Sequence, residues 1–138
     1  MVTFDFNDGK GPVPAHKHKN GGGWVADTAT VSDTAYVGRD ARVSGDTKVF
    51  GKARVNGKAK VSGAAKVSGD ALVYGNARIY GNAKVSGDAC VSGNAKVSGD
   101  AKVFGDAKVF SDAKVFGDAM VFGDAKVSGN SEVYDNAW

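Results

Sequence analysis

Cysteine, proline and histidine are scarce in this sequence, whose 138 residues include one cysteine, two prolines and two histidines. Because Cys90 is alone, no intrachain disulfide can form and nothing points to an oxidising compartment. No stretch approaches the roughly 18 consecutive apolar residues of a membrane-spanning helix. Residues 1–20 also lack the apolar segment of a signal peptide. These absences exclude a disulfide-stapled secreted domain and predict a protein that neither spans a membrane nor is exported by a signal peptide.

Charge and side-chain bulk are also limited. Lys and Arg number 18 against 15 Asp and Glu, and the net charge of +3 does not by itself indicate a nucleic-acid or membrane partner. Hydrophobic residues make up 42% of the chain, and most are Val and Ala, so any core must be narrow. Glycine, with 20 residues, is about twice as frequent as in an ordinary protein. The chain is long enough for one domain with a real core.

The dominant feature is a repeat of six residues. Val or Ile recurs at every sixth position over residues 25–133, without one insertion. Ala stands four residues after each of them except at Thr47 and Ser131. Over residues 45–129, Gly stands two residues after each, with Ser111 as the exception, and Asp or Asn usually follows. A fixed period of this kind is typical of a solenoid.

Each six-residue unit predicts one short strand and one corner. Within the unit, Ala-x-Val alternates with period two, which places Ala and Val on one face of a strand. Gly followed by Asp or Asn is a turn signal, because these residues tolerate positive φ. Stacked units would pair every strand with the coil above and below it, and would bury the Val column.

The repeat A-K-V-S/F-G-D/N resembles the hexapeptide repeat of left-handed parallel β-helices. The resemblance implies an all-β, single-stranded left-handed parallel β-helix, in which three units close one coil of a triangular prism. About six coils of 18 residues would then follow, with a short N-terminal capping segment. We therefore predict a leader over residues 1–23 and the β-helix over residues 24–138.

The start of the chain suggests an origin. The segment "GKGPVPAHKHKNGGGWVADTATVSDTAYVG" resembles the leader of hexapeptide-repeat proteins encoded by tailed phages and prophages, a largely uncharacterised group. That resemblance implies a protein of the host cytoplasm or of the virion.

On the predicted prism, the residue before each Val points outward, and residues 18 apart stack. Outward Lys on a β surface is ordinary solubilising chemistry, and the corner acids lie close in sequence. We therefore expect solvated faces and no nucleic-acid partner, with polyanion binding as the alternative. The three columns are Lys48, Lys66, Lys84 and Lys102; Arg42, Lys60, Arg78, Lys96 and Lys114; and Tyr36, Arg54, Leu72, Cys90, Lys108 and Lys126.

Apolar side chains gather towards the C-terminus. Phe104 and Phe122 are 18 residues apart, Met120 replaces a column Lys beside Phe122, and Trp138 lies 18 residues after Met120. These four residues predict an exposed apolar patch, which usually marks a contact site. We also expect the last coil to present a bare strand edge. Both features predict a homo-oligomer formed through the C-terminal end, or docking of a phage or host protein.

Catalytic patterns are missing. Enzymes of the hexapeptide fold place histidines at coil edges, whereas His16 and His18 both precede the first coil. We expect no catalytic residues, no cofactor and no metal site, and we expect these two histidines to be solvated, so that replacing both by Ala leaves the fold intact. The alternative is an iron site shared between chains, because His16-Lys17-His18 resembles the His-x-His motif of phage spike tips.

The sequence thus favours a non-enzymatic structural or interaction protein, a rigid β-helical rod that self-associates or docks a partner. Two alternatives stay open. One is a phage-encoded binder or inhibitor of a host component. The other is an acyltransferase-like enzyme.

Overall fold

In the computed structural model the chain forms an all-β structure, described here for residues 2–6 and 11–134. Two strands precede the repeat, and the repeat itself forms nineteen short strands at intervals of six residues. The strands are β1 Thr3–Asp5, β2 Pro12–Lys17, β3 Trp24–Ala26, β4 Thr30–Val31, β5 Tyr36–Val37, β6 Arg42–Val43, β7 Lys48–Val49, β8 Arg54–Val55, β9 Lys60–Val61, β10 Lys66–Val67, β11 Leu72–Val73, β12 Arg78–Ile79, β13 Lys84–Val85, β14 Cys90–Val91, β15 Lys96–Val97, β16 Lys102–Val103, β17 Lys108–Val109, β18 Lys114–Val115, β19 Met120–Val121, β20 Lys126–Val127 and β21 Glu132–Val133.

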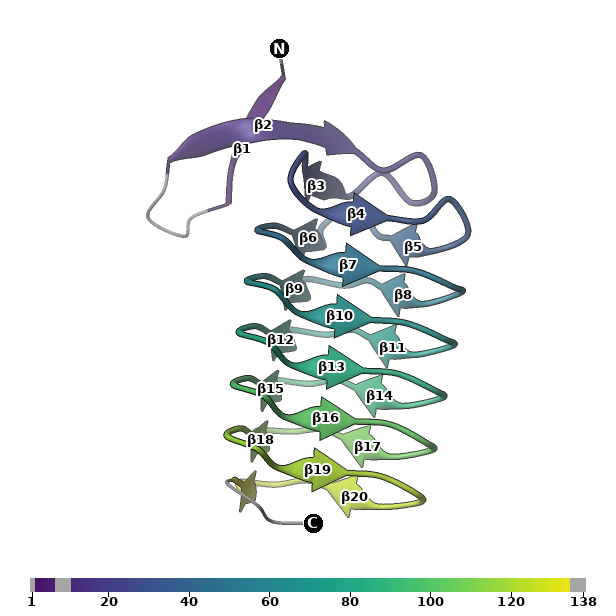
Figure 1. The fold of residues 1–138 in the computed structure, drawn as a ribbon, viewed down its shortest axis with the longest axis vertical. Coiled ribbons are helices and arrows are strands. Elements are labelled where there is room, and N and C mark those ends of the chain that lie inside the picture. Colours follow the sequence, from purple (N-terminus) through teal and green to yellow (C-terminus); the bar gives the residue numbers. More distant parts are fainter. Residues whose placement is uncertain (1, 7–10, 135–138) are drawn as a thin grey trace.

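The strands coil into a parallel β-solenoid of about six turns with roughly 18 residues per coil. Each strand from β3 to β18 pairs in parallel with the strand three places later, so Val67, for example, pairs with Val85 and Val85 with Val103. The result is three sheets: face B with β3, β6, β9, β12, β15, β18 and β21, face C from β4 to β19, and face D from β5 to β20. In Figure 1 the chain crosses the front from left to right through β7 and β10 and descends as it returns behind, so the coil is left-handed as predicted.

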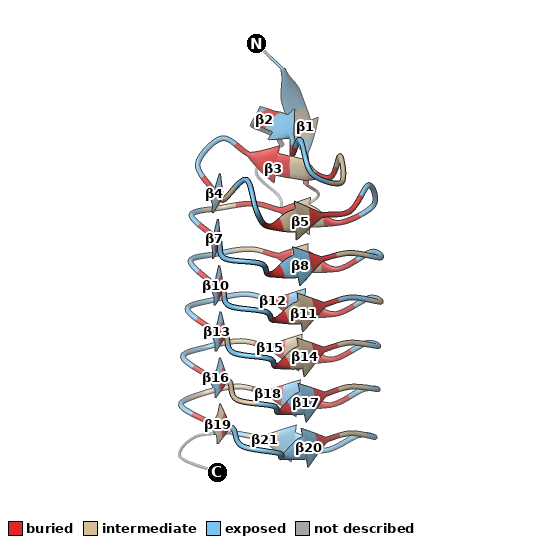
Figure 2. Cartoon of the chain, turned by 90° about the vertical axis from the view of Figure 1, so that its right-hand side faces the viewer, coloured by how far each residue is buried: buried red, intermediate tan, exposed pale blue. Residues whose placement is uncertain are grey.

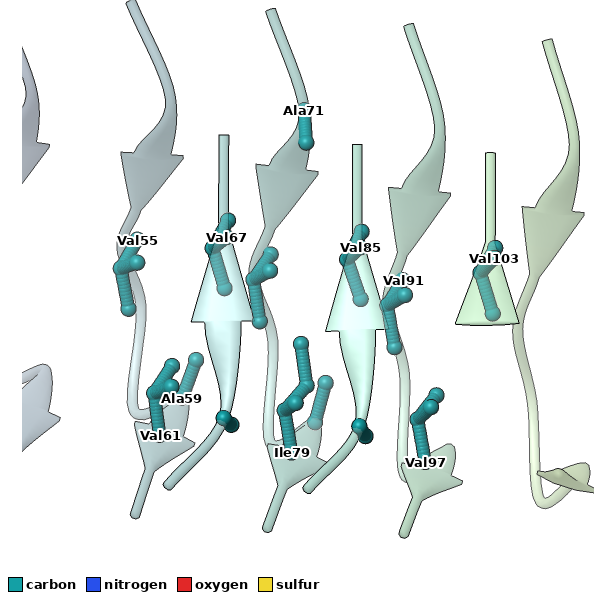
Figure 3. Packing of buried hydrophobic residues seen from close by; sticks show 14 of the residues in the cluster. Val55, Ala59, Val61, Val67, Ala71, Ile79, Val85, Val91, Val97 and Val103 are labelled. Atoms are coloured by element: carbon teal, nitrogen blue, oxygen red, sulfur yellow. The ribbon is translucent and has the colours of Figure 1, made fainter. Parts of the chain in front are cut away.

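The core is a single column of small apolar side chains. Every inward Val or Ile from Val37 to Val115 is fully buried, and so is nearly every inward Ala. Figure 2 shows these buried segments recurring at the same place in each coil, and Figure 3 shows Val67, Val85 and Val103 stacked in one row. Because the same residue type recurs in register, the coils interlock without large side chains, as a repeat protein requires.

The corners depend on glycine for two reasons. Gly57 has φ of +63°, a left-handed conformation that L side chains rarely adopt, and a Cβ built on it would lie 2.9 Å from the Gly75 nitrogen in the next coil. Among the described residues, Ser111 is the one non-glycine with positive φ, at 60°. At Gly57 the backbone of the next coil therefore lies too close for a side chain to fit without a shift.

The leader folds back over the N-terminal end of the solenoid, at the top of Figure 1. Strands β1 and β2 form an antiparallel hairpin, and β2 continues antiparallel onto β3, which extends face B. The ring of Phe4 stacks on Trp24 at 4.7 Å between centroids, and the Arg42 guanidinium lies 4.8 Å from the Phe4 centroid. The leader is thus held by aromatic and cation–π contacts as well as by the sheet.

Residues 18–23 cover the upper edge of β5. The amide of Val37 donates to the carbonyl of Asn20 at 3.1 Å, and the amide of Gly23 donates to the carbonyl of Val37 at 2.9 Å. His18 is buried, and its Nε2 lies 2.9 Å from the carbonyl oxygen of Ala35. The expectation of two solvated histidines is therefore wrong for His18, which shares the Ala35 carbonyl with the side-chain amide of Asn20, a donor at 3.1 Å. His16 is exposed, with Nδ1 2.7 Å from Asp27 Oδ1.

We expect His18→Ala to destabilise the protein and His16→Ala to leave it nearly unchanged. The first substitution removes a buried ring and its hydrogen bond, a loss of about 1–3 kcal/mol of unfolding free energy, whereas the second affects an exposed pair worth less than about 1 kcal/mol. Urea denaturation of the two variants measures the difference, and hydrogen exchange at the Val37 amide reports on the edge itself. Equal stabilities of the two variants would mean that His18 does not stabilise the leader against the upper edge of β5.

Candidate binding surfaces of the solenoid

The interior of the solenoid is filled by Val and Ala side chains over the residues that the structure describes. Over residues 2–6 and 11–134, no group of three His, Cys, Asp or Glu side chains is placed to hold a metal ion. Nor do these residues include a helix long and apolar enough to cross a membrane. The features that distinguish this solenoid are therefore on its outer faces.

The first is an aromatic surface around the last coils. On face C, the rings of Phe104 and Phe122 stack with centroids 5.3 Å apart and planes 8° apart. Met120 pairs with Lys102, so it occupies the next rung of a column that is otherwise basic. Phe122 is 40% exposed. Three of the four predicted interface residues thus lie together, whereas Trp138 falls outside the described residues.

A second aromatic pair lies on the neighbouring face and extends the predicted patch. On face B, Phe116 and Tyr134 stack with centroids 5.2 Å apart, and Tyr134 is 50% exposed. Prediction from the sequence placed the patch on one face alone, although the 18-residue spacing of this pair was the signal that could have found it. We call Phe104, Phe116, Met120, Phe122 and Tyr134 the C-terminal aromatic surface.

Inward side chains are less completely buried in the last coils than in the first. Val25 in the first coil is fully buried, whereas Val127 is 9% exposed and Val133 is only half-buried. Ala125, which occupies an inward position, is exposed. Apolar groups of the core and of the C-terminal aromatic surface are therefore accessible together, whereas the leader covers the opposite end.

The predicted columns of cations exist, and their positions are set by strand register. Lys66 pairs with Lys84 and Lys84 with Lys102 on face C, while Arg42, Lys60, Arg78, Lys96 and Lys114 follow one another on face B. Neighbouring rungs are about 4.8 Å apart, as in any β-sheet. Two unit charges at such a distance repel by on the order of 1 kcal/mol in water.

Corner carboxylates do not neutralise these columns. The charged contacts Lys19–Asp33 and His16–Asp27 both lie at the leader end, and neither involves a corner carboxylate paired with a column cation. Corner side chains instead contact their own column, since Asn76 Nδ2 donates to Asn94 Oδ1 at 3.3 Å and Asn94 Nδ2 to Asp112 Oδ1 at 3.2 Å. The sequence-based argument that nearby acids balance the lysines therefore does not hold at the level of side-chain contacts.

Face B is hollowed where its cations are most concentrated. A groove of about 300 Å³ runs along four coils, from the leader past the exposed ring of Tyr80. A second hollow of about 420 Å³ adjoins it towards the corner before face B. The groove is lined by Phe6, Arg42, Ser44, Lys60, Ser62, Arg78, Tyr80 and Lys96, and the second hollow by Lys58, Lys60, Asn76, Arg78, Asn94 and Lys96.

Parallel strands in register, glycine corners and a Val–Ala core define a β-solenoid repeat protein. In agreement, residues 77–93 match the family model described as the YdcK beta solenoid repeat. No curated protein and no solved structure matches the chain. The match spans about one coil and shows similarity in the repeat unit.

Proposed function

We propose that this protein is a non-enzymatic scaffold, a rigid β-helical rod whose copies associate through the C-terminal aromatic surface. The observation that carries the proposal is the stacked pair Phe104–Phe122, with Phe122 40% exposed on the outside of a fully folded coil. Aromatic side chains are enriched where protein surfaces meet, because they bury a large area at little entropic cost. The stack beside Met120 therefore favours association with a partner surface of the same apolar character.

The two ends of the rod differ, and this favours a symmetric pair. The leader occupies the N-terminal end, where β2 pairs with β3 and residues 18–23 cover β5. An aromatic surface that met a leader-covered end would build a head-to-tail filament, whereas two aromatic surfaces that meet each other give a closed dimer. We therefore propose a dimer formed between C-terminal ends.

A phage or prophage origin is part of the proposal and is supported by the resemblance of the leader to phage-encoded hexapeptide proteins. In that setting the same surface could take a phage or host protein instead of a second copy. The aromatic stack favours an apolar partner in either case. The rod itself would act by rigidity, because each coil contacts only its neighbours and bending would break the stacked core.

Mass measurement in solution tests the proposal. We expect the wild-type protein to be a dimer and the Phe122→Lys variant to be a monomer with an unchanged β-rich circular dichroism spectrum, because a buried charge at the interface would lose its hydration. The matched control is Phe50→Lys. Phe50 occupies the same position of the repeat on the same face and is 45% exposed, but it lies near the leader.

The measured masses decide whether copies associate through the C-terminal aromatic surface. A wild type that stays monomeric at its highest soluble concentration would overturn self-association. Dissociation by both substitutions would show that the contact runs along all of face C instead of its C-terminal end. The Phe122→Lys, Trp138→Ser double variant is expected to behave as Phe122→Lys does.

A further inference from the structure

We infer that the middle of face B is a binding site for a compact oligophosphate, a ligand that carries two or three linked phosphoryl groups. The site differs from the C-terminal aromatic surface in its residues and chemistry, although the two adjoin where Tyr80 and Lys96 share a hollow with Phe116. Its cations are Lys58, Lys60, Arg78 and Lys96, which we call the basic band.

The basic band is a part of the surface where carboxylates are few. Face B and its two flanking corners comprise residues 58–64, 76–82 and 94–100 in three successive coils, and Asp100, at the last corner, is the one acid in these segments. The other five corner positions are not acidic: Lys58, Ala64, Asn76, Asn82 and Asn94. Acidic side chains are therefore fewer here than at the other corners of the repeat, where Asp is the commonest residue.

Acids limit the basic band at both ends. At its upper end, Asp5 and Asp40 line a hollow together with Arg42, Lys58 and Lys60. Below it, Asp100 and Asp112 stand at the two corners of face B. A long polyanion laid along the rod would meet these carboxylates, whereas a short one would fit between them. The extent of three coils, about 10 Å, matches two or three phosphoryl groups.

Arg42 is not counted in the basic band, because the leader already occupies it. Its guanidinium lies over the ring of Phe4, and its Nη1 donates to the carbonyls of Arg39 at 3.4 Å and Ala41 at 3.2 Å. By contrast, the ion pairs Lys19–Asp33 and His16–Asp27 involve none of the cations Lys60, Arg78 and Lys96. These three rungs of one column therefore keep their charge available for a ligand.

The chemistry of the groove fits phosphate. Arg78 presents a planar donor fork between two ammonium groups, an arrangement suited to phosphate oxygens on adjacent groups. The hydroxyl of Ser62 and the amide of Asn94 line the same hollows and add neutral donors. The exposed ring of Tyr80, at the edge of the groove, can stack on a planar group that the phosphates carry.

Calorimetric titration of the full chain with sodium tripolyphosphate and with ATP tests this site. We expect both to bind at low salt and to bind more weakly as salt is raised. The Lys60→Gln, Arg78→Gln double variant should lose at least about tenfold in affinity, because it removes two charge-assisted contacts. The Lys84→Gln, Lys102→Gln variant is the matched control. It removes the same charge from adjacent rungs of face C and should change affinity less than about twofold.

The variants also identify the source of the phosphate. A Tyr80→Ser substitution that weakens ATP but not tripolyphosphate indicates a nucleotide, and one that weakens neither indicates a free oligophosphate. Equal losses in the two double variants would overturn the site, since the attraction would then be a property of the whole charged rod. Absence of tripolyphosphate binding at low salt would also overturn it. So would tighter binding of a single-stranded oligonucleotide, which would make face B a nucleic-acid surface.

Discussion

Replacing Val85 by Asp is expected to abolish folding. Val85 is fully buried and stacks between Val67 and Val103 in a core made of Val and Ala, where no polar partner is available. A carboxylate placed there would be desolvated without a compensating charge, and losses above about 4 kcal/mol are typical of such changes. Circular dichroism and urea denaturation of the variant give the measurement, with loss of the β spectrum as the expected result.

The neighbouring residue supplies the control. Lys84 precedes Val85 in the same strand but is exposed, and it pairs with Lys66 and Lys102. Lys84→Asp should change stability by less than about 0.5 kcal/mol, as exposed substitutions usually do. The new charge also relieves repulsion between like charges. If the two substitutions had the same effect, the assignment of inward and outward positions would be wrong.

Replacing a corner glycine in the middle of the rod is expected to be nearly as damaging. At Gly75, φ is +69°, and a Cβ would lie 2.9 Å from the Gly93 nitrogen in the next coil. Gly75→Ala therefore combines the cost of a left-handed Ala, about 1–2 kcal/mol, with a steric conflict between backbones. Overpacking of this kind adds about 1–3 kcal/mol. Thermal or urea unfolding measures the sum.

Gly123 separates the two contributions. Its φ is +64°, close to that of Gly75, yet a Cβ at Gly123 would meet nothing within 4 Å. Gly123→Ala should therefore show the conformational cost without the clash, and should be clearly less destabilising than Gly75→Ala. Equal effects would mean that the corner glycines serve positive φ alone and that adjacent coils can move apart.

The predicted interface shows which side-chain contacts can be inferred from the spacing of a repeat. Stacking of Phe104 on Phe122 follows from their spacing once a coil of 18 residues is assumed, and the structure confirms it. The same rule applies to Phe116 and Tyr134, a pair whose importance becomes clear only when both faces are seen to converge on one end. Trp138 lies beyond the described residues, so its part in the interface stays a prediction.

The leader illustrates what a repeat cannot predict. Residues 1–23 have no period, so nothing in their order says which strand edge they would meet. His18 is buried because the chain turns back after β2 and places its ring on the Ala35 carbonyl. Likewise, the corner amides contact one another along their column instead of reaching the lysines, which leaves the basic band unneutralised.

The sequence by itself determined which residues are inside, where each corner falls and which side chains point outward. Those features depend on alternation within six residues and on glycine conformation, both of which are local. Tertiary structure confirmed that three units close one coil, which the resemblance implied and the period alone does not give, and it alone decided how the leader covers the first edge. These depend on the angle through which each corner turns and on contacts 17 or 18 residues apart, such as those of His18 with Ala35 and of Asn76 with Asn94. A six-residue period specifies neither the corner angle nor these contacts.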